Sequence, residues 1–596
     1  MGFTLVFMDY LQTAPRSLQR GFTLILSQRK SGRCRFRFSV LVVAAVSLWS
    51  ASSARGQIPK KDAAVSWLYM VPGTVADRYA RTLENVGILP ERSAAARDGS
   101  EVWMFSAEER GTPEGVSLDA PPWHAVYRTS PSIEKRWGLL PVRTQSSFNT
   151  AFPFHRGSGP VWHGKGFTQS LEGGWFGKWG PFVLVLNPVW FRAENRDFVL
   201  APTGMDGEGR FRSPLESDAI DIPQRFGDEA YQVLSPGASS LRLNLVGLTV
   251  GVSSSPQVWG PGDLHPLVMG AVAGGIPHVF VGTSTPLNAW IADLDFRYMA
   301  GRTERSQWFG LTGDDRFALL NGFAASIRPR GLPGLQLGVT RLFHQPWPSA
   351  DGMMQELLKK PFEGILKTGL QGVDQRLDDQ FASVFARWMV TSAGAEVWLE
   401  FVRGDHSVDG RWLMLEPEDF GGYAVGFRKT WRSDSAFTVF HAEGIVSGTT
   451  HRERGGARLT SEWGMWGHYP GAIYGNSSYR IGGWTHRGQL LTTSAGPFGN
   501  GQSLGMDHYS PNGHWSLSVD RSIVREQPAA ARPSGEGVSD VLYVVSASST
   551  RFLDRWDIGL GIDWVMNLNR HLNRASDAMN IRLQATVSRR FSVFDR

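Results

Sequence analysis

The clearest pattern in the chain is an alternation of apolar and small or polar residues over Trp556–Leu568. Every even position is apolar, and the odd positions are mainly Asp, Gly and Asn. Because successive side chains of a β-strand point to opposite faces, the segment predicts a strand with one fully apolar face. A soluble sheet could show this alternation, but a transmembrane β-barrel requires it, because lipid lies outside and polar groups lie inside. Trp556 and Trp564 would suit an aromatic girdle at the membrane interface.

The same period of two recurs through the second half of the chain. It is present in Ala395–Phe401, in His514–Ile523 and in the C-terminal run from 581 to 591. Turn residues predict two hairpins, Phe167–Glu194 and Ala325–Phe343, which turn at 179–181 and 330–334. At about 20 to 25 residues per strand and connection, the chain from residue 146 onward would form roughly 16 to 20 strands.

The N-terminal segment has the features of an export signal. Five basic residues between positions 29 and 37 precede the apolar run Ser39–Trp49, and small residues occupy positions 50–54. The run is too short to span a bilayer, so the pattern predicts a signal peptide that is cleaved near Ala54 or Gly56. The alternative is a single N-terminal anchor helix.

Removal of this leader changes what the charge implies. The formal net charge of the chain is +6, but residues 1–56 carry +7 and leave −1 for the remainder. We therefore expect no nucleic-acid partner. The one cysteine, Cys34, also lies in the leader, so the mature chain would have no disulfide, no thiolate metal site and no cysteine nucleophile. Export without disulfides is typical of a bacterial envelope protein.

The chain divides into three predicted regions. Residues 1–56 form the N-terminal extension and signal peptide, 57–145 a helical and irregular region that faces the periplasm, and 146–596 the barrel. In the second region, Asp77–Val86 has helical spacing, and Gly87 is a suitable C-cap. The predicted fold is an all-β, antiparallel transmembrane β-barrel of about 18 strands, with a small N-terminal helical region.

Four segments with recurring motifs are spread in order along the chain: Gly159–Val199, Gln257–Pro277, Gly331–Arg341 and Ser461–Asp520. They resemble the corresponding segments of the Wzi family of capsule-assembly outer-membrane proteins. In the first, the residues that match the family's pattern are Trp162, Gly164, Gly166, Trp179, Gly180, Pro181, Ala193, Glu194 and Asn195. The fourth departs from the family, because its tyrosine-rich motif is replaced here by Ile481–Gly488.

The resemblance implies a monomeric, non-enzymatic barrel of about eighteen strands in the bacterial outer membrane. It further implies a lectin-like role, in which the protein retains capsular or exopolysaccharide on the cell surface. A porin-like or exopolysaccharide-export channel is the alternative. The expected partners are therefore polysaccharide and outer-membrane lipid, and no cofactor is expected.

Sugar binding needs flat aromatic surfaces and planar polar groups at an exposed loop rim. The candidate polysaccharide-binding residues are Trp259, Trp463, Trp466, Trp484, His486 and Arg487. For any single tryptophan we favour the alternative, in which the ring anchors the membrane interface or fills the lumen. Arginines near loops could pair with uronic-acid carboxylates, whereas most lumen charges should pair with each other. The expected inward-facing acidic partners are Glu396, Glu400, Glu462 and Asp520.

The sequence supports a catalytic function less well than a binding function. The paired carboxylates Asp314-Asp315 and Asp378-Asp379 could belong to a hydrolase, but adjacent residues of a strand point apart, which favours solvated loops. His155 and His163 lie in one loop without the further ligands that a zinc site needs. The sequence contains no serine nucleophile elbow, phosphate-binding loop or dinucleotide fingerprint. We therefore expect neither an enzyme nor a metal site.

Overall fold

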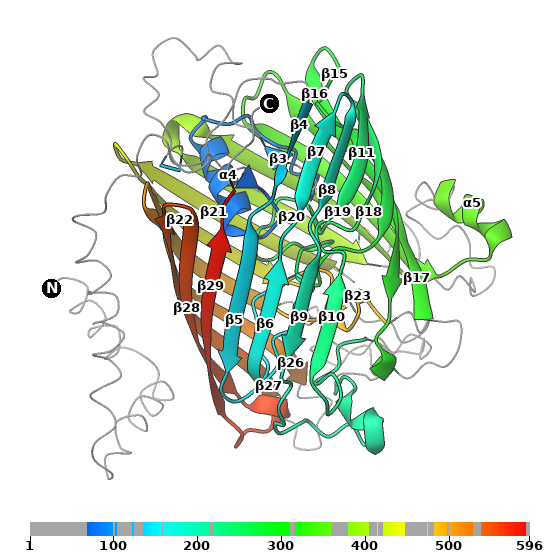
Figure 1. Cartoon of the computed structure of the whole chain (residues 1–596). Coiled ribbons are helices and arrows are strands. Elements are labelled where there is room, and N and C mark those ends of the chain that lie inside the picture. The colour runs from blue at the N-terminus through cyan, green and yellow to red at the C-terminus, as the bar shows by residue number, and fades with distance from the viewer. Residues whose placement is uncertain are drawn as a thin grey trace. The chain divides into compact units, whose positions relative to one another are not determined.

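The computed structural model is a closed antiparallel β-barrel (Figure 1). It describes residues 68–98, 102–103, 122–123, 135–157, 159–214, 220–309, 316–358, 379–404, 414, 421–447, 474, 482–497, 500–527 and 538–591. The leader with Cys34, and the candidates Trp463, Trp466 and Glu462, lie outside these residues. Among the described residues, no helix is long and apolar enough to cross a membrane.

The first part of the barrel wall consists of short strands. These are β4 (Lys135–Leu139), β5 (Val142–Asn149), β6 (Gly166–Glu172), β7 (Trp175–Trp179), β8 (Phe182–Leu186), β9 (Val189–Ala193), β10 (Tyr231–Ser235), β11 (Ser240–Leu245), β12 (Leu248–Ser253), β14 (His278–Thr283) and β15 (Leu287–Asn288).

The strands that follow are mostly longer. They are β16 (Ala292–Glu304), β17 (Phe317–Pro329), β18 (Leu335–Pro346), β19 (Asp379–Val390), β20 (Ala395–Gly404), β21 (Gly421–Arg432), β22 (Phe437–Val446), β25 (Asn500–Ser510), β26 (Gly513–Gln527), β27 (Val538–Leu553), β28 (Trp556–Leu568) and β29 (Ala578–Arg589).

The barrel closes where the last strand pairs with an early one. Strand β29 is antiparallel to β5, in a register that joins Arg582 to Asn149 and Arg589 to Val142. Five crossings of the wall are interrupted part-way, so that β4/β5, β6/β7, β8/β9, β10/β11 and β14/β15 each form one crossing. Counted in this way, the 23 described strands of the sheet make 18 crossings, which confirms the predicted barrel of about eighteen strands.

The barrel begins earlier than the predicted boundary at residue 146. That position lies inside β5, and β4 already pairs with β7 from Lys135 onward. Leu140 and Pro141 separate β4 from β5, and a proline that interrupts the period of two hides the strand before it. Residues 61–596 form one compact unit, so the described part of the 57–145 region packs as part of the barrel.

The predicted strand faces are confirmed by burial. On β28, Trp556, Leu560 and Trp564 are exposed, whereas Asp557 and Asp563 are buried. On β20, Val397 and Leu399 face outward in the same way, and Glu396 and Glu400 face inward. Lipid-facing and lumen-facing residues alternate in this manner in membrane barrels.

The two ends of the barrel differ. At one end, which we call the short-turn end, the strands are joined by tight connections at 180–181, 246–247, 289–291, 330–334, 391–394, 433–436, 511–512 and 554–555. At the opposite, long-loop end, the connections are 150–165, 194–230, 254–277, 305–316, 347–378, 405–420, 447–499, 528–537 and 569–577. Exposed tryptophans gather near the short-turn end, as in an interfacial aromatic girdle: Trp137, Trp179, Trp388, Trp431, Trp515 and Trp556.

The predicted helix is present as α4 (Val75–Asn85) and lies inside the barrel. The side chain of Thr74 accepts a hydrogen bond from the N–H of Asp77 and caps the first turn, while Gly87 with φ +75° follows the helix. Tyr79 stacks on Trp123 at a ring-centroid distance of 4.0 Å and packs beside Tyr509, an inward residue of β25. The helix therefore fills part of the lumen near the short-turn end.

Two loop segments also fold into the lumen. In the first, β13 (Gln257–Trp259) pairs with β2 (Ala96–Asp98), the segment that follows α4. In the second, β23 (Thr485–His486) pairs with β24 (Gln489–Leu490). Small pairings remain between β1 (Leu68–Tyr69) and β3 (Val102–Trp103), and helix α5 (Ala350–Leu358) follows β18.

Candidate functional site

The candidate aromatic residues occupy the lumen core. Trp259 and Trp484 are both 0% exposed, so the prediction that they lie at an exposed loop rim is wrong for these two residues. Trp484 Nε1 donates to the carbonyl of Val268 at 2.8 Å, and its ring packs edge-on against Phe381 at 4.4 Å. An indole whose ring faces and N–H are all occupied fills the lumen, which is the alternative considered for each tryptophan.

The neighbouring residues of the second inserted segment reach the long-loop end of β16. His486 is buried, and its Nδ1 accepts a hydrogen bond from the N–H of Glu304 at 3.1 Å. Arg487 is different, because its side chain is 41% exposed. Its main-chain N–H donates to the carbonyl of Glu304, and its Nε donates to the Glu304 carboxylate at 2.8 Å. The backbone of Arg487 has φ +50°, in the left-handed region, and Gly488 follows with φ +78° in the turn between β23 and β24.

Two arginines, Arg316 and Arg487, pair with this carboxylate, and a third, Arg302, lies two residues before it in β16. We call the group of Arg302, Glu304, Arg316 and Arg487 the rim cluster. Arg316 forms an ion pair with Glu304, and its side chain is 65% exposed. The guanidinium of Arg302, which is exposed, lies over the ring of Phe317 at 4.3 Å. The cluster therefore carries two positive charges in excess and presents planar guanidinium groups to solvent. Of these residues, sequence reasoning identified Arg487 and missed Arg302, Glu304 and Arg316, which no motif marks.

A buried aspartate holds three loops together beside the rim cluster. Both carboxylate oxygens of Asp221 accept hydrogen bonds from Ser306, one from its N–H at 2.6 Å and one from its hydroxyl at 2.5 Å. The N–H of Asp221 donates to the carbonyl of Gly482 at 2.8 Å. Burial raises the pKa of Asp221 to about 6, and the hydrogen bonds from Ser306 and the charge of Arg305 oppose that rise.

The sequence predicts inward carboxylates that pair with other charges, and two of the three described ones, Glu396 and Asp520, do so. Glu396, Glu400 and Asp520 are all buried and face inward. Asp520 forms an ion pair with Arg156, whereas Glu400 accepts a hydrogen bond from Ser383 at 2.8 Å. Glu396 is the centre of a larger network.

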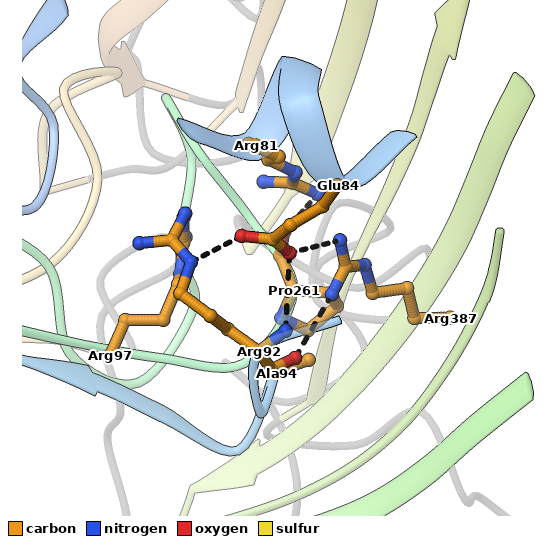
Figure 2. A pocket seen from close by; sticks show the side chains of 7 residues that line it. All are labelled: Arg81, Glu84, Arg92, Ala94, Arg97, Pro261 and Arg387. Carbon is orange, nitrogen blue, oxygen red and sulfur yellow. Dashed lines mark hydrogen bonds and ion pairs between the residues drawn. The ribbon is translucent and has the colours of Figure 1, made fainter. Parts of the chain in front are cut away.

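That network is a closed ring of ion pairs between α4, the inserted segments and the wall. In order around the ring, its members are Glu396, Arg428, Asp263, Arg97, Asp77, Arg92, Glu84 and Arg387. Arg81 of α4 joins it from the side, with Nη2 at 2.6 Å from Glu396. We call these eight residues the lumen ring; Figure 2 shows five arginine and glutamate side chains of this region around a small pocket. Sequence reasoning missed the ring, although Asp77, Arg81 and Glu84 lie on one face of the predicted helix.

The histidines of the 150–165 loop form no metal site with other residues that the structure describes. His163 Nδ1 shares a hydrogen bond with the hydroxyl of Ser147 at 2.6 Å, and burial lowers the pKa of both His155 and His163. Among the described residues, no group of three or more His, Cys, Asp or Glu side chains is arranged to hold a metal ion. Asp314, Asp315 and Asp378 lie outside the described residues.

Comparison with known proteins identifies similar barrels but no family. No family model matches the chain, and no curated protein matches it. Among solved structures, Wzi of Escherichia coli, described as an outer membrane protein involved in group 1 capsule assembly and a carbohydrate-binding β-barrel, is 11% identical with a TM-score of 0.45. The match covers 76% of this chain and 84% of Wzi.

Other outer-membrane barrels match to a similar extent. Acinetobacter baumannii OccAB2 is 9% identical, with a TM-score of 0.37 over 77% of this chain and 98% of OccAB2. The outer membrane protein OprD of Pseudomonas aeruginosa is 8% identical, with a TM-score of 0.35 over 77% of this chain and 93% of OprD. At this level of similarity, function has to be argued from the residues of this chain.

The lumen ring should stabilise the packing of α4 against the wall. Replacing Glu396 with glutamine leaves Arg81, Arg387 and Arg428 without their shared carboxylate, and we expect a loss of about 3–5 kcal/mol in unfolding free energy. Glu400→Gln is the matched control on the same face of β20, with an expected loss below about 1.5 kcal/mol. Urea unfolding of the purified barrel measures both values, and equal losses would contradict a special role for the ring.

The three loops that Asp221 connects should be held together more stably in acid than at neutral pH. Its folded pKa of about 6 lies above the ordinary value of 3.8, so the folded state binds the proton more tightly than the unfolded state. This stabilisation is complete below about pH 4 and is lost as the pH rises through 6. His486 stays neutral across this window, because burial lowers its pKa to about 3.

The measurement is amide hydrogen exchange over residues 482–490, corrected for the intrinsic rate, at pH 4.5 and pH 7.5. Protection should fall with pH in the natural chain and in Asp197→Asn, an exposed aspartate of the neighbouring loop. It should become independent of pH in Asp221→Asn. If the protection of residues 482–490 still fell with pH in Asp221→Asn, a titratable group other than Asp221 would be responsible.

Proposed function

We propose that this protein is an outer-membrane barrel that binds acidic polysaccharide non-covalently at its long-loop end and so attaches capsular or exopolysaccharide to the cell. In this arrangement the long loops face the cell exterior, and the short turns and α4 face the periplasm, as is usual for such barrels. The predicted signal peptide would supply the export route. The bound partners would be surface polysaccharide and outer-membrane lipid, with the protein acting as a monomer.

The observation that carries the proposal is the exposed positive charge of the rim cluster. A guanidinium group matches a carboxylate with two parallel hydrogen bonds, which suits uronic acids and other acidic sugars. Arg487 and Arg316 share a single acidic neighbour and are 41% and 65% exposed, so both retain donors that face solvent. Because Arg487 binds Glu304 through both its main-chain N–H and its Nε, and Trp484 is fixed in the lumen core, binding would require little ordering of Arg487.

The content of the lumen favours surface binding over transport. A porin-like or export channel needs a continuous polar path, whereas the inserted loops bury Trp259, Trp484 and Tyr474 within this barrel. On the rim-cluster argument, the residues proposed for binding are Arg302, Arg316 and Arg487. Trp463 and Trp466 are kept as candidates for stacking on sugar rings. We propose no catalytic residue.

The first experiment is performed on cells. In a deletion strain, the total amount of polysaccharide should be unchanged, but the ratio of cell-bound to released polysaccharide should fall and should recover with the complementing gene. An unchanged ratio would reject the attachment role. Conductance of the purified barrel in a planar bilayer would then support the channel, and time-dependent shortening of the polysaccharide would support a hydrolase.

The second experiment tests the rim cluster on the purified protein. The double substitution Arg316→Gln and Arg487→Gln should weaken binding to a uronic-acid polysaccharide by about tenfold or more, because each charged hydrogen bond contributes roughly 1.5–3 kcal/mol. Arg330→Gln is the control, since this 45%-exposed arginine pairs with Asp293 at the short-turn end. Equal affinity of the double variant and the natural chain would place the site elsewhere.

A further inference from the structure

We propose that helix α5 (Ala350–Leu358) is a membrane-contact element, whose exposed apolar side inserts into the lipid interface at the long-loop end of the barrel. The helix follows β18 in the connection 347–378, and Figure 1 shows it outside the wall, beside β17. The inference depends on the transmembrane barrel and is independent of polysaccharide binding at the rim cluster.

Two side chains of the wall attach α5 to the outer face of the barrel. The hydroxyl of Tyr298 in β16 donates to the carbonyl of Leu357 at 2.7 Å, and Nδ2 of Asn321 in β17 donates to the carbonyl of Glu356 at 2.9 Å. Both side chains face outward, because the residue after Tyr298 and the residue before Asn321 belong to the lumen core. The last carbonyls of a helix have no partner within the helix, and here the wall supplies donors for two of them.

The outer face of the wall changes from exposed to covered along these strands. Nearer the short-turn end, the outward side chains Ile327 of β17 and Val339 of β18 are 41% and 43% exposed. Toward the long-loop end, Leu319, Asn321 and Phe343 also point outward but are at most 2% exposed, and Asn321 pairs with Phe343 across the sheet. Hydrocarbon would leave the amide of Asn321 without a partner. The helix therefore shields this polar position, while the wall below it stays open to lipid.

The position of α5 along the strands matches the far boundary of the lipid-facing band. The girdle residue Trp388 pairs with Leu335 at the start of β18. A rise of about 3.3 Å per residue at a tilt of about 40° puts Phe343 roughly 20 Å and Trp347 roughly 30 Å beyond that level. Because the apolar band of such a barrel is about 25 Å tall, its boundary falls between these two residues, which is where α5 begins and docks.

Large apolar side chains are exposed at this level. Trp347, which precedes α5, is 43% exposed, and Met354 within the helix is 64% exposed. An indole suits the interface because its ring is apolar and its N–H is a donor, and an interfacial helix buries its apolar side about 5–10 Å into the headgroup boundary. Both side chains continue the exposed apolar surface of β17 and β18. Lipid is therefore the occupant that matches them, whereas a polysaccharide would present mainly hydroxyl groups.

The test uses the full chain with Cys34→Ser, reconstituted in phosphatidylcholine vesicles, with a fluorescent label on Met354→Cys. Its emission should fall about twofold in lipid brominated near the headgroup end of the acyl chains, and less in lipid brominated near the chain ends, because the helix lies at the interface. Val339→Cys, in the lipid-facing wall, should be quenched mainly by the chain-end bromines. Asp197→Cys, whose native side chain is 87% exposed in the 194–230 loop, should be quenched by neither.

The outcomes at position 354 separate the possible occupants. An unquenched label with the emission maximum of water would place α5 in solvent and overturn the proposal. An unquenched label with a blue-shifted maximum would overturn it in favour of protein cover, for example by a second copy of the chain. Quenching equal to that of Val339→Cys in the chain-end lipid would contradict the interfacial depth and place α5 within the hydrocarbon.

Discussion

The structure depends on the closure of the sheet by β29 and β5. A strand edge exposed to lipid leaves main-chain N–H and C=O groups without partners, and each such group costs several kcal/mol. Pairing from Arg582–Asn149 to Arg589–Val142 removes that edge. Once the sheet is closed, every strand has a lipid side and a lumen side, which requires the period of two seen in Trp556–Leu568. The outward apolar residues and the inward charges follow from the same constraint.

Closure of the sheet also encloses a large interior space that has to be filled. An eighteen-crossing barrel encloses more space than wall side chains can fill, and this chain fills it with α4 and two loop segments. The polar wall then has to be matched by polar groups on the inserted segments. The lumen ring does this by alternating arginines and carboxylates from both sides, so that most buried charges have a partner of opposite sign. Removal of a single member takes one of the two partners from each of its neighbours in the ring, which is why such networks are sensitive to substitution.

The sequence predicts the wall well because the signal is local. Alternation over ten residues determines both the strand and its faces, and Glu396, Glu400 and Asp520 were assigned to the lumen from that signal alone. The contents of the lumen depend on contacts between residues far apart in the chain, such as Trp484 with Val268, and no local pattern encodes them. An indole ring serves equally for stacking on a sugar and for filling a core, so composition cannot separate the two roles.

The segment from Trp484 to Arg487 shows how lumen and rim are connected. Sequence reasoning grouped these residues as one binding surface, whereas the structure divides their positions between core and rim. Trp484 is fixed in the core by its hydrogen bond to Val268 and its contact with Phe381, and His486 bonds to the end of β16. These contacts hold the backbone of Arg487 in a left-handed conformation next to Glu304. The buried aromatic residue thus acts on the rim indirectly: it determines where an exposed guanidinium group lies, and a ligand bound at the rim would depend on the packing of the lumen below it.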